Sequence, residues 1–178
     1  MKFIFADSMD FVDPNFDFIE DRSSPSREIY WDDKYPHEMM SKAPYDGMLV
    51  SKAIVGGSKV SGRYTNAQAM MFNRIGAREF LRYREKDFPT SMMIGDCGAF
   101  SYHKMETPPY SPAEMVDFYG DGEFTHGCSV DHVIFDFVPD DQVGSLGNEQ
   151  LEENRRRFEI TSENAQLFLK ESARLGNR

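Results

Sequence analysis

One short stretch of the sequence combines a carboxylate, small residues and an aromatic ring. It is the segment 95–100, Gly-Asp-Cys-Gly-Ala-Phe, which follows the apolar run at 92–94. A carboxylate at the end of a buried strand can accept hydrogen bonds from a ligand, and Phe100 offers a ring for stacking. Gly98 would let the backbone approach a ligand closely. The segment is typical of a pocket for a flat ring such as a nucleobase, although a turn or a helix N-cap would use the same residues.

Guanine is the nucleobase that best suits a carboxylate. It presents N1–H and an exocyclic amino group as adjacent donors, and one carboxylate can accept from both. Two aspartates, Asp96 and Asp136, could make this contact, because each follows a short apolar run. The residues themselves leave open which aspartate does so, and Asp136 also suits a strand that simply continues into a loop.

Four short apolar runs predict buried strands, and a polar residue follows each of them closely. The runs span residues 3–5, 48–50, 92–94 and 133–135. The polar residues are Asp7, Ser51, Asp96 and Asp136. Their even spacing indicates a repeated strand, loop and helix unit, and in parallel sheets functional groups gather at the carboxyl ends of the strands. We therefore expect Asp7 and Ser51 to lie beside Asp96 as strand-end contacts.

Helix signals lie between the predicted strands. The segments 65–68, Thr-Asn-Ala-Gln, and 111–114, Ser-Pro-Ala-Glu, are capping boxes that begin helices. The first of these helices should break near Gly76, and apolar residues recurring on one face predict a further helix from about residue 148. The segment 8–46, rich in Asp, Pro, Ser and aromatic residues, predicts a long loop insertion after the first strand.

Strands that alternate with helices predict an α/β fold with a parallel sheet. A complete (β/α) barrel of eight units takes ~250 residues. Four units in 178 residues therefore predict a partial TIM (β/α) barrel with about four of its eight strand–helix units.

Composition narrows the cellular setting and the partners. The formal net charge is -10, which disfavours nucleic-acid binding without excluding it, because phosphate contacts normally come from Lys and Arg. No apolar run is long enough for a membrane span or a secretory signal, so we expect a cytoplasmic protein that does not enter membranes. Cys97 and Cys128 are then expected to be free thiols.

Several motifs together resemble a known enzyme family. Segment 96–100 resembles the Asp-Ser-Gly-Gly-Phe motif of tRNA-guanine transglycosylases, and segment 133–136 resembles the later strand that carries a base-recognising aspartate in that family. Further motifs are similar to the DNA-modifying branch of the family, the DpdA proteins. These motifs lie at 5–8, 30–33, 43–51 and 124–132. The resemblance extends over nearly the whole chain.

The resemblance implies a TIM-barrel enzyme that exchanges guanine in DNA for 7-cyano-7-deazaguanine. DNA, rather than tRNA, and the 7-deazaguanine base are the partners it implies. Asp96 would be the general acid/base that contacts the incoming base, Phe100 the stacking platform, and Asp136 the reader of the guanine edge. The remaining base-binding positions would be Cys97, Gly98 and Ala99. Cys97 and Ala99 depart from the serine and glycine of the RNA enzymes, so contacts there are expected to differ.

In that family the nucleophilic aspartate and the zinc-binding cysteines belong to the later half of the chain, and no counterpart is found here. The resemblance thus identifies residues 1–178 as the N-terminal part of a transglycosylase-like TIM-barrel domain, with the insertion at about 8–46. We expect no cofactor within this chain, since the structural zinc would belong to the C-terminal part. We also expect the chain to be inactive alone and to need a complementary C-terminal chain.

Two alternatives belong to other functional classes. One is a metal-dependent hydrolase on the same barrel, with histidine and carboxylate ligands at the strand ends. Its candidate ligands are His126, Asp131, His132 and Asp136, whose spacing matches no standard site. The other is a non-catalytic half or remnant that needs a partner chain, because half a barrel exposes sheet edges.

Overall fold

A parallel four-stranded sheet organises the chain. The computed structural model describes residues 1–135, 138–139, 142, 144, 146–174 and 176. The sheet has the order β1-β2-β3-β4, with every neighbouring pair parallel. The strands are β1 (Ile4–Ala6), β2 (Gly47–Ser51), β3 (Met92–Asp96) and β4 (His126–Gly127). The predicted α/β class with a parallel sheet is confirmed, and the arrangement is consistent with part of a barrel.

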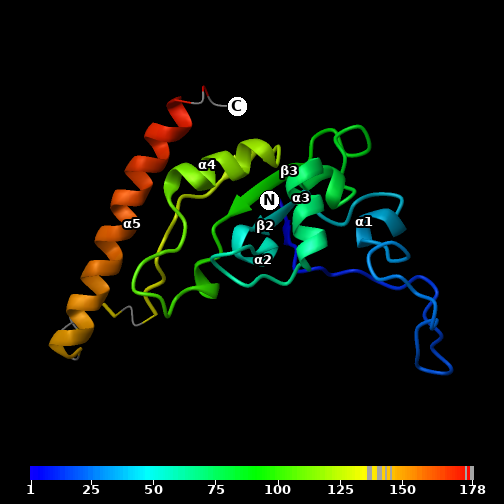
Figure 1. The fold of residues 1–178 in the computed structure, drawn as a ribbon, viewed down its shortest axis with the longest axis horizontal. Helices are drawn as coiled ribbons and strands as arrows, with labels where there is room; N and C mark the ends of the chain where they lie inside the picture. The colour runs from blue at the N-terminus through cyan, green and yellow to red at the C-terminus, as the bar shows by residue number, and fades with distance from the viewer. Residues whose placement is uncertain (136–137, 140–141, 143, 145, 175, 177–178) are drawn as a thin grey trace.

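Helices connect the strands in the alternation that the sequence predicts (Figure 1). They are α1 (Pro36–Met39), α2 (Lys52–Val55), α3 (Asn66–Phe80), η1 (Ala99–Ser101), α4 (Pro112–Asp121) and α5 (Asn148–Arg174). Both predicted capping boxes are confirmed: the side chains of Thr65 and Ser111 each accept a hydrogen bond from the backbone three residues on, at 3.2 Å. Gly76 breaks α3 as predicted, with a φ of 80°.

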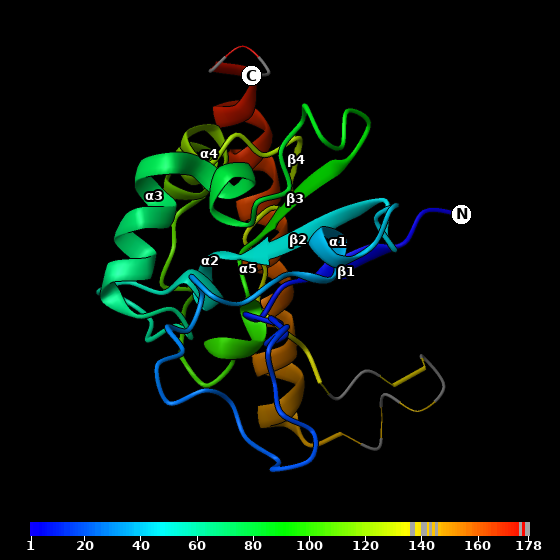
Figure 2. The ribbon, with the colours of Figure 1, turned by 90° about the vertical axis from the view of Figure 1, so that its right-hand side faces the viewer.

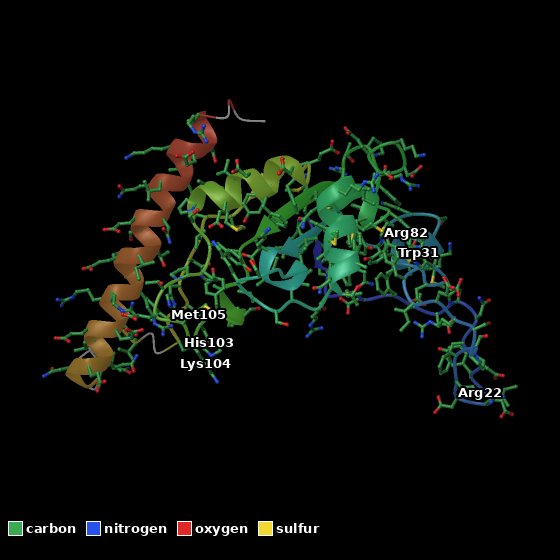
Figure 3. All side chains as sticks on the ribbon, viewed as in Figure 1. Arg22, Trp31, Arg82, His103, Lys104 and Met105 are labelled. Atoms are coloured by element: carbon green, nitrogen blue, oxygen red, sulfur yellow. The ribbon has the colours of Figure 1, made fainter. Side chains whose placement is uncertain are left out.

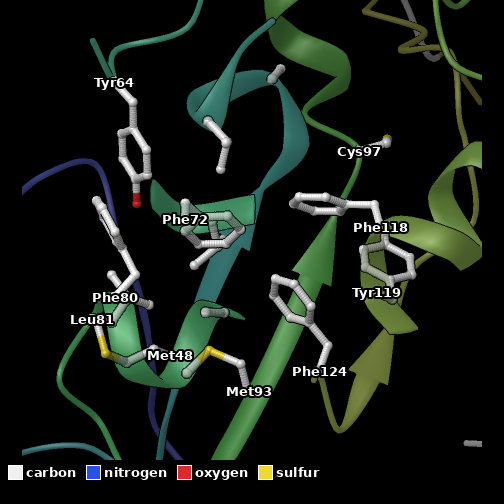
Figure 4. Packing of buried hydrophobic residues seen from close by; sticks show 14 of the residues in the cluster. Met48, Tyr64, Phe72, Phe80, Leu81, Met93, Cys97, Phe118, Tyr119 and Phe124 are labelled. Atoms are coloured by element: carbon white, nitrogen blue, oxygen red, sulfur yellow. The ribbon is translucent and has the colours of Figure 1, made fainter. Parts of the chain in front are cut away.

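The two faces of the sheet differ in how they are covered. Met48, Val50 and Met93 share one face and are fully buried. Aromatic side chains from α3, α4 and the loop after α4 pack over this face, with Phe72 between Phe80 and Phe118 (Figure 4). Figure 2 shows α3 and α4 on the same side of the sheet. This covered face holds most of the apolar core.

The opposite face is only partly covered. Strand side chains alternate between the two faces, so Leu49 and Ile94, which lie opposite one another in the register, belong to this second face. Ser51 and Asp96 follow on the same face as the last opposed pair of β2 and β3. All four side chains are half-buried. The open face therefore ends in a hydroxyl and a carboxylate at the carboxyl edge of the sheet.

Tyr119 explains why α4 lies so close to the sheet. Its ring occupies the space above two glycines: a Cβ on Gly95 would lie 2.1 Å from the ring, and one on Gly127 would lie 2.4 Å from it. The Tyr119 hydroxyl also donates a hydrogen bond to the Cys128 carbonyl at 2.9 Å. β3 and β4 thus carry glycine where the helix needs room.

The predicted fourth strand at 133–135 is wrong. β4 is instead the short pair His126–Gly127, which lies opposite Ile94 and Gly95. The apolar run predicts a strand by composition, whereas the segment that pairs with β3 is the one that carries Gly127 beneath the Tyr119 ring. Asp136, predicted to end that strand, lies outside the described residues.

The two ends of the molecule carry its remaining segments. α5 packs beside α4 through an edge contact of Phe168 with Tyr119 at 6.0 Å, and the segment between β1 and α1 projects at the opposite end (Figure 1). In that segment, isolated antiparallel bridges pair Val12 with Lys34 and Asp17 with Arg22.

Within the described part of the chain, no helix has the length and apolar character needed to cross a bilayer.

Candidate functional site

The two carboxyl oxygens of Asp96 differ in their contacts with the described residues. Its Oδ2 accepts hydrogen bonds from the Ser51 hydroxyl at 2.7 Å and from the Gly98 backbone N–H at 2.9 Å. Its Oδ1 accepts none from the described residues, and the side chain is half-buried. The two donors hold the carboxyl group in place, because both converge on one of its oxygen atoms. The free oxygen can accept a hydrogen bond from a ligand or exchange a proton with it.

Gly98 makes the turn that completes this arrangement. Its φ of 81° lies in the left-handed region, and a Cβ there would lie 2.6 Å from the Cβ of Ala53. Only glycine fits both constraints. The segment is therefore a turn in which Asp96 accepts from a backbone N–H two residues on, and that turn also aims Asp96 and starts η1.

Phe100 is the exposed aromatic residue of the segment. Its side chain is 74% exposed, although it follows directly after the buried Ala99. The ring of Phe135, 55% exposed, meets it edge-on with the centroids 6.0 Å apart. An exposed ring in the turn that follows Asp96 can support the face of a planar ligand.

Cys97 faces away from any ligand on this side. The side chain is fully buried, and its thiol donates a hydrogen bond to Asp131 Oδ1 at 2.9 Å. Burial raises the pKa of the Cys97 thiol to about 12, so the group stays protonated and is a poor nucleophile. The Cys97 carbonyl meanwhile accepts from Ala53 N at 3.3 Å. Any contribution of Cys97 to a ligand site is therefore made through its backbone and its packing.

Asp7 lies in a different environment from Asp96. It is 3% exposed and accepts hydrogen bonds from the Tyr64 hydroxyl at 2.9 Å and from Met9 N at 3.3 Å. Burial raises its pKa to about 6. Since Ala6 lies opposite Leu49, Asp7 falls in the row of Val50, on the covered face. The structure brings Ser51 and Asp96 together at the strand ends, but it does not bring Asp7 to them.

The sequence did not single out Asp131 and Phe135 as neighbours of this site. The sequence predicts Asp131 only as a candidate metal ligand, together with His126, His132 and Asp136. His132 is buried, and its Nε2 hydrogen-bonds the Met105 carbonyl at 2.9 Å. Among the described residues, no group of three or more His, Cys, Asp or Glu side chains is placed to hold a metal ion. The run 133–135 is uniformly apolar, so no local sequence signal distinguishes Phe135 as an exposed ring.

Comparison with known proteins adds independent information. No protein-family model matches the chain. The chain is 42% identical over 174 residues to a DNA-guanine transglycosylase of Salmonella montevideo. The match covers 97% of this chain and 40% of that relative, so the chain spans well under half of the relative's length. This similarity supports the transglycosylase relationship that the motifs predict.

Proposed function

We propose that this chain carries the base-binding part of a DpdA-type enzyme, which exchanges guanine in DNA for 7-cyano-7-deazaguanine. The observation that carries the proposal is the Asp96 carboxyl group, which Ser51 and Gly98 hold through Oδ2 while Oδ1 has no partner among the described residues, followed four positions later by the exposed ring of Phe100. The similarity to a DNA-guanine transglycosylase supports guanine in DNA as the target. A base in a duplex must leave the stack before it can reach such a site.

The contacts of Asp96 favour proton transfer over reading the guanine edge. Oδ2 already accepts two hydrogen bonds, so its acceptor sites are used. Oδ1 alone can face the base, which suits a group that gives a proton to the leaving guanine and takes one from the incoming base. Reading two adjacent donors would then belong to Asp136, which lies outside the described residues and has this role by resemblance.

The nucleophile is proposed to come from polypeptide outside these 178 residues. In the mechanism that the resemblance implies, an aspartate attacks the sugar C1′, guanine departs with the bonding electrons, and the incoming base displaces the aspartate. None of the motif positions matched here has that role. We therefore expect no incorporation of labelled guanine into DNA by this chain alone, and robust turnover by the isolated chain would contradict this part of the proposal.

Calorimetric titration with 7-cyano-7-deazaguanine tests the binding role. Asp96→Asn should weaken binding by about 10–100-fold, because a hydrogen bond to a charged group contributes about 1.5–3 kcal/mol. Phe100→Ala should weaken it by about 5-fold or more through loss of stacking, which is worth about 1–3 kcal/mol. Asp7→Asn is the matched control and should bind like the wild type. Equal affinity of the wild type and Asp96→Asn would refute the proposal.

A further inference from the structure

The aromatic surface at the candidate site continues beyond Phe100. Phe135 lies next to it, and His103 also meets Phe135 edge-on, with the ring centroids 5.2 Å apart and the planes at 84°. His103 Nδ1 lies 2.7 Å from the Phe100 carbonyl oxygen. Because a carbonyl only accepts, this contact places a proton on Nδ1. The three rings form one aromatic row, defined here as Phe100, Phe135 and His103.

A cleft of about 420 Å³ lies beside this row, between the loop after η1 and the first turns of α5. Its lining includes His103, Lys104, Val133, Phe135 and Arg157. Its volume lies within the ~300–1,000 Å³ range of small-molecule sites. The cleft has an aromatic wall and a cationic rim, a combination that suits a nucleotide.

Lys104 is the available cation of the cleft. It is exposed, and it forms no ion pair with the part of the chain that the structure describes. Arg157, by contrast, donates to the Val133 carbonyl and to Glu153, both at 2.6 Å. Glu153 is shared with Arg156, so the acid of the cleft is already neutralised. Lys104 therefore offers a free positive charge in a chain whose net charge is -10.

The loop that carries these groups is held against its surroundings. The Met105 carbonyl hydrogen-bonds His132 Nε2 at 2.9 Å, and the Glu106 carbonyl accepts from Arg156 of α5. Figure 3 shows His103, Lys104 and Met105 together near α5, at the opposite end of the molecule from Arg22 and Trp31. Anchors on both sides preorganise the loop, which reduces the entropy lost when a ligand binds.

We propose that this cleft binds the nucleotide adjacent to the target guanine in the same DNA strand, with its base against Phe135 and its phosphate at Lys104. The inference rests on the proposed function, which places the target base at Asp96 and Phe100. The planes of the Phe100 and Phe135 rings are inclined at 63°, so bases lying against the two rings could not be parallel as stacked bases are. The two rings therefore suit neighbouring bases that have been unstacked, as a base-exchange reaction requires. The phosphate contact would fix the register of the strand.

Fluorescence anisotropy with a labelled single-stranded oligonucleotide containing one guanine tests this inference. Phe135→Ala should weaken oligonucleotide binding by about 5-fold or more, since base–aromatic stacking contributes about 1–3 kcal/mol. Lys104→Ala should weaken the binding of oligonucleotides of every sequence to the same extent, because a phosphate contact does not read the base. It should also reduce the magnitude of the slope of log affinity against log salt concentration by about 0.7. Phe135→Trp, which keeps a stacking surface, should restore binding. Lys104→Ala should leave the affinity for free 7-cyano-7-deazaguanine unchanged.

The exposed Lys170, further along α5, supplies a matched control: Lys170→Ala removes the same charge away from the cleft and should have little effect. If oligonucleotide binding is absent, or survives both alanine changes, the inference is overturned. The proposed function would still stand in that case if Asp96→Asn lowers the affinity for the free base. If Asp96→Asn leaves the affinity for the free base unchanged, the proposed function is overturned instead. Circular dichroism verifies that each variant is folded.

Discussion

Asp7 and Asp96 follow two strands of one sheet, yet they occupy opposite environments. Asp7 lies on the covered face, 3% exposed, with the Tyr64 hydroxyl on one oxygen and Met9 N on the other. Asp96 lies on the open face, half-buried, with both of its donors on a single oxygen. A polar residue at a strand end is therefore a site candidate only when its position in the alternation directs it away from the helices.

The same contrast separates stability from binding. Asp7 has no free oxygen, and its burial makes ionisation costly, which is a structural effect. Asp96 is fixed by neighbours and keeps one acceptor available, which suits contact with a ligand. Changes on the covered face should therefore alter folding, and changes at the end of the open face should alter binding.

The largest expected effect is the pH dependence caused by Asp7. Its folded pKa is raised from 3.8 to about 6, so the folded state favours the protonated form. The resulting stabilisation is fully present below about pH 4 and is lost as the pH rises through about 6. A shift of about two units corresponds to about 3 kcal/mol. The side chain in Asp7→Asn cannot ionise. Urea unfolding of this variant should therefore show no such loss in the free energy of unfolding between pH 4 and pH 8. Parallel pH curves for the two proteins would contradict the assignment.

The next effect concerns the contact between α4 and the sheet. Gly95→Ala places a Cβ against the Tyr119 ring, and overpacking of this kind costs about 1–3 kcal/mol. Gly120→Ala is the matched control, because nothing lies within 4 Å of a Cβ added there within the described residues, and alanine favours a helix by about 0.5–1 kcal/mol. Urea unfolding should show a loss for Gly95→Ala and no loss for Gly120→Ala. Equal stability of the two variants would show that Tyr119 can move aside.

The smallest effect is expected for Ser51→Ala on the open face. It removes one of the two donors that fix Asp96 and leaves the Gly98 contact in place. We expect calorimetry to show a loss of affinity for 7-cyano-7-deazaguanine of about 5-fold, since one hydrogen bond contributes about 1 kcal/mol. The free energy of unfolding should fall by no more than about 1 kcal/mol, because Ser51 is only half-buried and Asp96 keeps its contact with Gly98. A larger effect on stability than on binding would place Ser51 with Asp7 rather than with Asp96.

The sequence predicts what depends on local chemistry. The capping boxes at Thr65 and Ser111, the break at Gly76 and three strands follow from neighbouring residues, and the structure has them. The fourth strand could not be located in this way, because β4 contains no apolar run and its Gly127 packs against Tyr119 of α4. A contact between segments distant along the chain leaves no short-range signal.

The candidate site also combines features that the sequence predicts with features that depend on tertiary contacts. The pairing of Ser51 with Asp96 follows from strand ends that lie in register, so the spacing of polar residues could anticipate it. The burial of Asp7 depends on Tyr64, and the aromatic row depends on the path of the chain after β4. Both are tertiary features. Resemblance supplies roles for Asp96 and Phe100, but it does not indicate that Phe135 and His103 extend the same surface.

The most direct test of the central claim is a titration of the ¹⁵N-labelled chain with 7-cyano-7-deazaguanine, followed by amide NMR. The account predicts shifts at Ser51, Gly98, Ala99 and Phe100 around Asp96, with none at Met9 or Tyr64 beside Asp7. The shifts around Asp96 should disappear in Asp96→Asn and persist in Asp7→Asn. Shifts that cluster around Asp7, or none at 96–100 under saturating base, would contradict the account.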